Sequence, residues 1–183
     1  MEQSDEVLVS RVQEGSSESF APLVQRYQRP VFNLMYRYTR SEQEAADLTQ
    51  EVFLRAYEKL ASYRPGRSFF SWLFALASNR ARDWHRKNGR KIRHEQSLRL
   101  AGQEPGPVSG QEKRLEEKEQ LELVEALLQR LPARTREILI LRYRHERSIR
   151  EIATIFACSQ SAVKMRISRG LRELQDMMAN KET

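Results

Sequence analysis

Apolar residues recur at helical spacing along the first 90 residues, and no alternating pattern typical of a strand persists. The sequence therefore predicts an all-α fold. Ser4, followed by two acidic residues, predicts the start of a short helix that ends at Gly15. Ser17 predicts the start of a second helix, and Pro30 is expected to interrupt it, so that a third helix follows.

The next stretch carries clear signals for the start of two further helices. Ser41 with Glu44 forms a capping box, followed by an apolar series at helical spacing: Ala45, Leu48, Val52, Leu54, Tyr57 and Leu60. Residues 61–67 contain Pro-Gly and predict a loop. Ser68 then predicts the start of a helix that becomes basic toward its end and has the apolar face Phe69, Trp72, Leu73, Leu76 and Ala77.

Residues 94–118 interrupt the helical pattern with a cluster of Gly and Pro among polar residues, which indicates a flexible linker. An apolar stripe resumes at Leu115 and ends at Leu131-Pro132, before a helix with Ile138, Leu139 and Leu141. We therefore predict two small helical domains, residues 1–93 and 119–183, joined by the linker 94–118.

The C-terminal domain ends in a pattern typical of a helix-turn-helix. Ser148 predicts the start of its first helix, residues 157–159 fit the tight turn, and Ser159 predicts the start of the second helix. On that second helix, Val163, Ile167, Gly170, Leu171 and Leu174 share the inner face. The expected base readers are Lys164, Met165, Ser168 and Arg169, with Arg166 and Arg172 on phosphates. The alternative is a helical hairpin with a solvated basic face.

The net charge of +7 favours a polyanionic partner. Basic residues outnumber acidic ones 16 to 11 in residues 1–93 and 12 to 9 in 119–183, against 4 to 5 in 94–118. No apolar run approaches a membrane span, and the first ten residues do not resemble a signal peptide, so we expect a cytoplasmic protein without membrane insertion.

One cysteine and three histidines have no spacing suited to a metal site or a disulfide framework, so no metal or other cofactor is expected. Cys158 is expected to be a small buried residue in the turn, and a redox role for it stays open.

Two polar faces in the N-terminal half are candidates for binding. The helix that begins near Ser41 carries Asp47, Gln50, Glu51 and Arg55 close to one face. The following helix combines charged residues with residues able to contact bases: Asn79, Arg80, Arg82, Asp83, Arg86 and Lys87. Taken alone, either face could be an ordinary solvated surface.

The combination of segments resembles extracytoplasmic-function (ECF, group IV) sigma factors of bacterial RNA polymerase. The resemblance rests on DLTQEVFLRAYEKL, FSWLFALASNRARDWHRK, LPARTREILILRYRHERSIREIA and VKMRISRGLREL, which occur in the family's order over almost the whole chain. It implies a helical region-2 domain and a helical region-4 domain.

The resemblance also implies roles for individual residues. Asp47, Gln50 and Glu51, with Phe53 and Arg55, would dock on the β′ clamp helices of core RNA polymerase, and the C-terminal domain would meet the β flap. Residues 61–68, with the polar residues Asn79, Arg80, Arg82, Asp83, Arg86 and Lys87, would capture a flipped base of the −10 element and hold the neighbouring phosphates. Trp72 is expected to pack in the core. Lys164, Met165, Ser168 and Arg169, flanked by Arg166 and Arg172, would read the −35 element.

The expected function is therefore to direct core RNA polymerase to promoter DNA, under control of an anti-sigma factor. The chain is not expected to be an enzyme, because no nucleophile, base and oxyanion group converge in its pattern. It departs from the family at residues 159–163, where relatives commonly have P-x-G-T-V and this chain has Ser-Gln-Ser-Ala-Val, so base preferences do not transfer. Two alternatives stay open: a stand-alone helix-turn-helix regulator, and a sigma-like decoy that binds a protein partner.

Overall fold

Helices joined by short turns make up the fold in the computed structural model, which describes residues 3–64, 66, 68–99, 123–124 and 126–179, with side chains left out of the description for 89–99. None of these residues lies in a strand, which confirms the all-α prediction. Contacts divide the chain into two units, one of Met1–Gly89 with the short segment Thr154–Ala157, and one of Arg90–Ala153 and Cys158–Thr183, which contains α6 and α8. Each unit is described here by itself.

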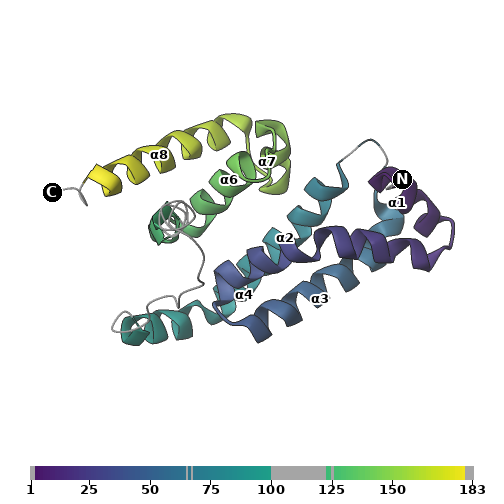
Figure 1. The fold of residues 1–183 in the computed structure, drawn as a ribbon, viewed down its shortest axis with the longest axis horizontal. Coiled ribbons are helices and arrows are strands. Elements are labelled where there is room, and N and C mark those ends of the chain that lie inside the picture. The colour runs from purple at the N-terminus through teal and green to yellow at the C-terminus, as the bar shows by residue number, and fades with distance from the viewer. Residues whose placement is uncertain (1–2, 65, 67, 100–122, 125, 180–183) are drawn as a thin grey trace, which may run out of the picture. The chain divides into compact units, whose positions relative to one another are not determined.

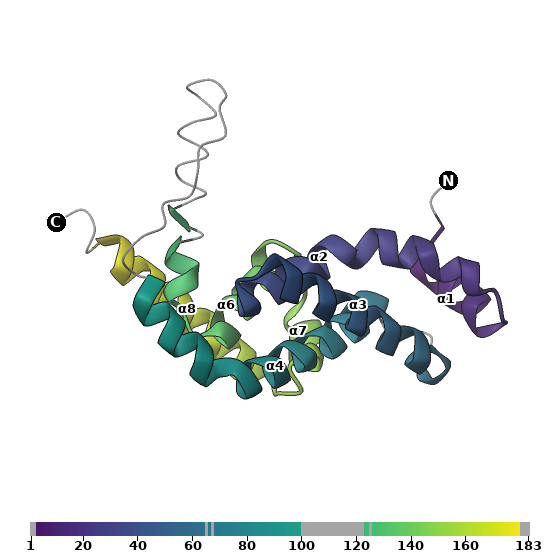
Figure 2. The same cartoon turned by 90° about the horizontal axis from the view of Figure 1, so that it is seen from below.

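The first unit is built from α-helices and short 3₁₀ turns. In chain order its described elements are α1 (Asp5–Gln13), η1 (Ser17–Phe20), α2 (Ala21–Thr39), α3 (Glu42–Lys59), η2 (Leu60–Ser62) and the part of α4 (Phe69–Arg99) up to Gly89. Helices α2 and α3 lie side by side in both views (Figures 1 and 2). Because α4 reaches Arg99, residues 94–99 of the predicted linker are helical, and residues 100–118 of it lie outside the described residues.

The helix starts follow the predicted caps. The Ser4 hydroxyl accepts a hydrogen bond from the Val7 N–H at 3.4 Å, and Ser68 accepts one from the Ser71 N–H at 3.3 Å. After α1 the chain turns at Gly15, whose φ of +106° favours glycine. The predicted start of α1 and its end near Gly15 are therefore confirmed.

The predicted interruption at Pro30 is wrong, because α2 continues through it as one helix of 19 residues. Pro30 removes one backbone hydrogen bond and costs about 3 kcal/mol in a helix interior. Leu23, Val31 and Leu34 lie on the same face and are almost completely buried. Their burial favours a single helix, since each such side chain contributes about 1.5–3 kcal/mol.

Helix α3 begins with half of the predicted capping box. Ser41 accepts from the Glu44 N–H at 3.4 Å, but the Ser41 N–H donates to the Thr39 hydroxyl at 3.3 Å. The Glu44 carboxylate instead accepts from the indole N–H of Trp84 on α4, at 3.0 Å. The reciprocal half of the box is thus replaced by a link between α3 and α4.

The core of the first unit is rich in aromatic side chains near the start of α4. Tyr63 and Phe69 are buried, and their ring centroids lie 5.9 Å apart. Trp72 contacts both, with centroid distances of 5.4 Å to Tyr63 and 5.6 Å to Phe69. Trp72 therefore packs against core rings as expected, but it is itself only half-buried.

The C-terminal part of the chain contains α6 (Ala133–Tyr143), α7 (Ile149–Ile155) and α8 (Gln160–Ala179), preceded by helical residues 126–130. Its fully or nearly fully buried side chains include Leu131, Ile138, Leu141, Ile152 and Val163. Helices α6 and α8 approach closely at Gly170, where an added Cβ would lie 2.6 Å from Thr135 Cγ2 and 3.1 Å from Leu139 Cδ1. The absence of a side chain at this position therefore permits the close packing of α8 on α6.

Candidate nucleic-acid and polymerase interfaces

A pocket of about 520 Å³ lies where α3 and α4 meet. Helix α4 contributes Leu76, Asn79, Arg82, Asp83 and Arg86, and α3 contributes Arg55 and Lys59. The α4 residues share a face because they are spaced at three and four residues. Four cations and one carboxylate give the pocket a positive balance, while an amide and a carboxylate can pair with the edge of a base.

Hydrogen bonds organise the α4 wall of this pocket. An Arg82 guanidinium nitrogen donates to the Asn79 side-chain oxygen, and Arg82 Nε donates to the Ser78 carbonyl at 3.3 Å. Arg86 pairs with Asp83 at 3.3 Å. Both arginines are thus held beside the two residues best suited to contact a base.

Two residues predicted to act with this group lie apart from it. Arg80 Nε pairs with Glu51 Oε2 on α3 at 2.6 Å, and neither residue lines the pocket. Lys87 is exposed and also does not line the pocket. The structure therefore brings together four of the six candidate −10 residues, which are Asn79, Arg82, Asp83 and Arg86.

The loop before α4 is fixed at both ends. Gln13 Nε2 donates to the carbonyls of Leu60 and Tyr63, at 2.8 and 3.1 Å. Phe69, at the start of α4, packs against Tyr27 with a centroid distance of 5.7 Å. The predicted loop begins with the turn η2, Gly66 has a φ of +87°, and Pro65 and Arg67 lie outside the described residues.

The polar face of α3 exposes Asp47, Gln50, Glu51 and Arg55, as expected. Phe53 differs from them, because it is only 7% exposed and packs against Phe20 at 6.4 Å between ring centroids. Phe53 can support the exposed residues of this face from the core side, but its own side chain offers little surface to a partner.

Two residues of the apolar series on α3 are exposed. Leu54 is 59% exposed and Tyr57 is 45% exposed. Leu54 lies at the centre of the face formed by Asp47, Gln50 and Glu51, since it follows them by seven, four and three residues. Both residues belong to the apolar series in the sequence, and the structure leaves them at the surface. A single exposed Leu is common on protein surfaces, so it does not by itself mark a binding site.

The helix-turn-helix has complete caps. Ser148 and Glu151 form a reciprocal box: the Glu151 N–H donates to Ser148 Oγ at 3.2 Å, and the Ser148 N–H donates to Glu151 Oε2 at 2.9 Å. Ser159 accepts from the Ala162 N–H at 3.2 Å and starts α8. Between the helices, Ala157 has a φ of +48°.

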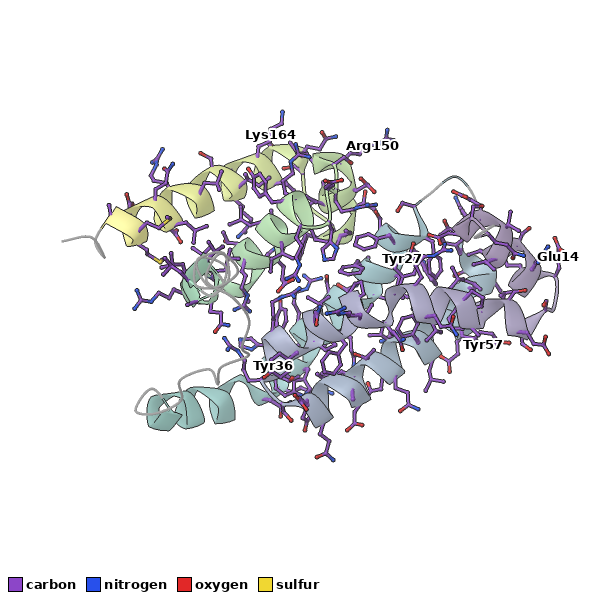
Figure 3. All side chains as sticks on the ribbon, in the orientation of Figure 1. Glu14, Tyr27, Tyr36, Tyr57, Arg150 and Lys164 are labelled. Carbon is purple, nitrogen blue, oxygen red and sulfur yellow. The ribbon has the colours of Figure 1, made fainter. Side chains whose placement is uncertain are left out.

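The outer face of α8 presents the residues that the sequence placed there. Lys164, Met165, Ser168, Arg169 and Arg172 are exposed, with Met165 at 50%, and Arg166 is half-buried. Lys164 points away from α6 (Figure 3). On the inner face Val163 and Gly170 are buried, as predicted, whereas Leu171 is exposed and does not belong to that face. The N-terminal half of α8 thus exposes two basic residues, Lys164 and Arg169, together with Met165 and Ser168.

Cys158, the candidate metal ligands and the candidate membrane spans add no further site within the described residues. Cys158 is a half-buried free thiol in the turn before α8, not a fully buried one. No group of three or more His, Cys, Asp or Glu suited to a metal ion occurs in the described ranges. None of the described helices combines the length and apolar character needed to cross a membrane.

Family models cover both units. The model of Sigma-70 region 2 matches residues 23–91, and that of Sigma-70 region 4 matches residues 121–174. The RNA polymerase sigma-H factor of Pseudomonas aeruginosa is 31% identical over 174 residues, covering 92% of this chain and 90% of that protein. The ECF RNA polymerase sigma-E factor of Escherichia coli (strain K12) is 33% identical over 172 residues, covering 91% and 90%.

Solved structures show the same fold. CnrH, in complex with the cytosolic domain of CnrY, is similar with a TM-score of 0.70 and 24% identity, covering 97% of this chain and 99% of that one. The sigma factor RpoE of Bartonella quintana, in complex with the anti-sigma factor NepR, has a TM-score of 0.68 and 23% identity, covering 88% and 98%. With its two matched regions and its full-length relatives, the chain belongs to the ECF sigma factors of RNA polymerase.

Proposed function

We propose that this sigma factor directs core RNA polymerase to promoters by reading duplex DNA at the −35 element with α8 and by capturing a base of the opened −10 strand in the pocket between α3 and α4. The polymerase carries out the chemistry, and this chain supplies recognition and melting in the cytoplasm. The observation that carries the proposal is the pocket, because it combines hydrogen-bonding groups for a base edge with cations for the adjacent phosphates.

The pocket has the chemistry that an extruded nucleotide requires. A flipped base exposes its Watson–Crick edge, to which the Asn79 amide and the Asp83 carboxylate can hydrogen-bond. Leu76 offers an apolar contact for the base. Arg55, Lys59 and Arg86 surround the same space and would neutralise phosphates on the captured strand. Contacts of this kind offset an unstacking cost of a few kcal/mol, so recognition would favour melting.

Docking on core polymerase is assigned to the polar face of α3. Asp47, Gln50 and Glu51 surround the exposed Leu54, which suits a partner surface with basic groups around an apolar contact. We assign this face to the β′ clamp helices and the C-terminal unit to the β flap. Glu51 is partly engaged by Arg80, so Asp47, Gln50 and Leu54 are the freer contacts.

Promoter recognition at −35 is assigned to the exposed residues of α8. Lys164, Met165, Ser168 and Arg169 lie on its N-terminal turns, which approach base edges in this motif, and Arg166 and Arg172 are placed for phosphates. The box formed by Ser148 and Glu151 and the cap at Ser159 fix the starts of both helices of the motif.

An anti-sigma factor is the proposed regulator. Two structural neighbours are seen with a partner, one with the cytosolic domain of CnrY and one with the anti-sigma factor NepR. A partner that covered the α3 face or the basic face of α8 would block polymerase or promoter binding.

The pocket is tested by Asn79→Leu in the full chain. This change removes both hydrogen-bonding groups and keeps a similar size, so we expect binding to single-stranded non-template oligonucleotides of the −10 region to weaken by about 1–3 kcal/mol. Binding to duplex −35 oligonucleotides should stay unchanged. Fluorescence anisotropy with both DNA types, at one fixed salt concentration, measures the two effects.

The matched control is Gln25→Leu, which makes the same polar-to-apolar change at an exposed position of α2. It should alter neither DNA affinity. Equal single-strand binding by Asn79→Leu and the native chain would refute the role of the pocket.

A further inference from the structure

Helix α1 precedes the residues matched by the region-2 model, which begins at residue 23, and the function proposed above gives it no role. It is nevertheless firmly attached to the first unit. Leu8 and Val9 are each 2% exposed, and Asp5 accepts hydrogen bonds from both Arg26 and the Tyr27 hydroxyl on α2. Burial, followed by the hydrogen bond to Asp5, raises the pKa of Tyr27 above its ordinary value.

The other end of α1 holds the start of the loop before α4. One amide nitrogen of Gln13 donates to two carbonyls, those of Leu60 at 2.8 Å and Tyr63 at 3.1 Å. These carbonyls flank η2, the turn in which α3 ends and the chain changes direction. Gln13 is about 50 residues away in sequence, and α1 contacts η2 directly, so this is a tertiary restraint on the loop.

The same helix also reaches the far end of the loop through Tyr27. Tyr27, labelled in Figure 3, is held by Asp5 of α1 and packs against Phe69 and Phe70, the first residues of α4. Tyr63 packs on Phe69, and burial, followed by the charges of Glu6 and Asp5, raises the pKa of Tyr63. Side chains of α1 therefore contact one end of the loop 61–68 directly, through Gln13, and the other end indirectly, through Tyr27.

Two described residues between these anchors, Arg64 and Gly66, make few contacts. Arg64 and Gly66 are exposed, and Gly66 adopts a positive φ of 87° with no atom within 4 Å of an added Cβ. Exposed loop residues can meet a captured strand in a defined position only if the ends of the loop are held in place. The position of Arg64 and Gly66 relative to Asn79 and Asp83 then depends on where η2 and Phe69 are fixed.

We propose that α1 is the positioning element of the −10 capture loop and that Gln13 is its positioning residue. This inference rests on the function proposed above. Gln13 touches no DNA in this scheme. It lowers the cost of ordering the loop for strand capture, because the two carbonyls of its base are already fixed before DNA binds.

The test uses the full chain assembled with core polymerase, on a promoter fragment found by run-off transcription. Gln13→Leu removes the two hydrogen bonds at similar size. We expect permanganate reactivity of thymines in the opened strand to fall about 5- to 10-fold, as the loss of two neutral hydrogen bonds would allow. Affinity for core polymerase and for the closed promoter at low temperature should stay within about twofold, since neither contact involves the loop.

Two variants separate positioning from a general loss of structure. Gln13→Lys places a donor on the same helix end and can reach both carbonyls, so it should restore most of the opening. Gln25→Leu, at an exposed position of α2, should have no effect. Hydrogen exchange of residues 60–64 in the free chain should rise in Gln13→Leu and return toward the native rate in Gln13→Lys.

Several results would overturn the inference. Native opening by Gln13→Leu would do so, as would unchanged exchange at residues 60–64, or a loss of core binding by the same factor as the loss of opening. Failure of the native holoenzyme to open any promoter would instead refute the proposed function itself. The two failures are therefore distinguishable.

Discussion

Ala157 lies in the turn of the helix-turn-helix with a φ of +48°, in the left-handed region that disfavours residues with a Cβ. Such a conformation costs an L-residue about 1–2 kcal/mol relative to right-handed backbone. The side chain of Ala157 is exposed, so no buried contact compensates for this cost. The strain stays local to the turn that sets the angle between α7 and α8.

We predict that Ala157→Gly raises the free energy of unfolding of the C-terminal unit. The gain should be about 0.5–1 kcal/mol, because the relief of backbone strain is partly offset by the greater freedom of Gly in the unfolded chain. Urea denaturation followed by circular dichroism measures it. Ala126→Gly, at an exposed helical position, should instead lower the stability by about 1 kcal/mol, and a loss of stability in both variants would contradict this interpretation.

Individual exposures on α3 could not be predicted from the sequence. Val52, Phe53 and Leu54 are consecutive apolar residues, and they span about 200° of a helix. Periodicity cannot decide which of the three faces solvent, and the structure buries Phe53 against Phe20 and exposes Leu54. Lys59 and Gln13 were also missed, although the spacing of Arg55 and Lys59 at four residues was a usable signal for the pocket.

At the scale of helices, the residues at which helices begin could be predicted from the sequence, but the continuation of α2 through Pro30 could not. Ser4, Ser41, Ser148 and Ser159 all accept the expected capping hydrogen bonds, because these depend on neighbouring residues alone. The continuation of α2 through Pro30 depends on burial against α3 and the rest of the first unit. The helix propensities of the local residues carry no information about such tertiary packing.

The packing of α8 on α6 leads to a prediction for Gly170→Ala. The new Cβ would lie 2.6 Å from Thr135 Cγ2, so either the buried Thr135 side chain or the helices must shift. We expect a net loss of stability of about 1–3 kcal/mol, even though Ala favours a helix over Gly by about 1 kcal/mol. Chemical denaturation of the full chain measures the change.

A second substitution tests whether this contact is the cause. Thr135→Ser removes the Cγ2 methyl group that the Cβ introduced by Gly170→Ala would strike, so combining the two substitutions should recover much of the lost stability. Neutral or stabilising behaviour of Gly170→Ala alone would show that α6 and α8 are not as close as described.

At the scale of the whole molecule, composition and pattern predicted an all-α chain of two small domains, and the helical structure and the two matched regions agree with that. The polar faces of α4 and α8 were also predictable, because their chemistry follows helical spacing. The pocket could not be predicted, since it forms only where α3 meets α4. The pairing of Arg80 with Glu51 is tertiary for the same reason and links the candidate polymerase face to the candidate DNA face.

Run-off transcription with sigma-free core polymerase tests the proposed function most directly. The templates are a pool of genomic promoter fragments from the source organism, transcribed with and without the full chain. We predict discrete new transcripts that depend on the chain and share sequence elements near −35 and −10. Absence of any new transcript, despite binding of the chain to core polymerase or duplex DNA, would contradict the proposed function and favour a decoy or a stand-alone regulator.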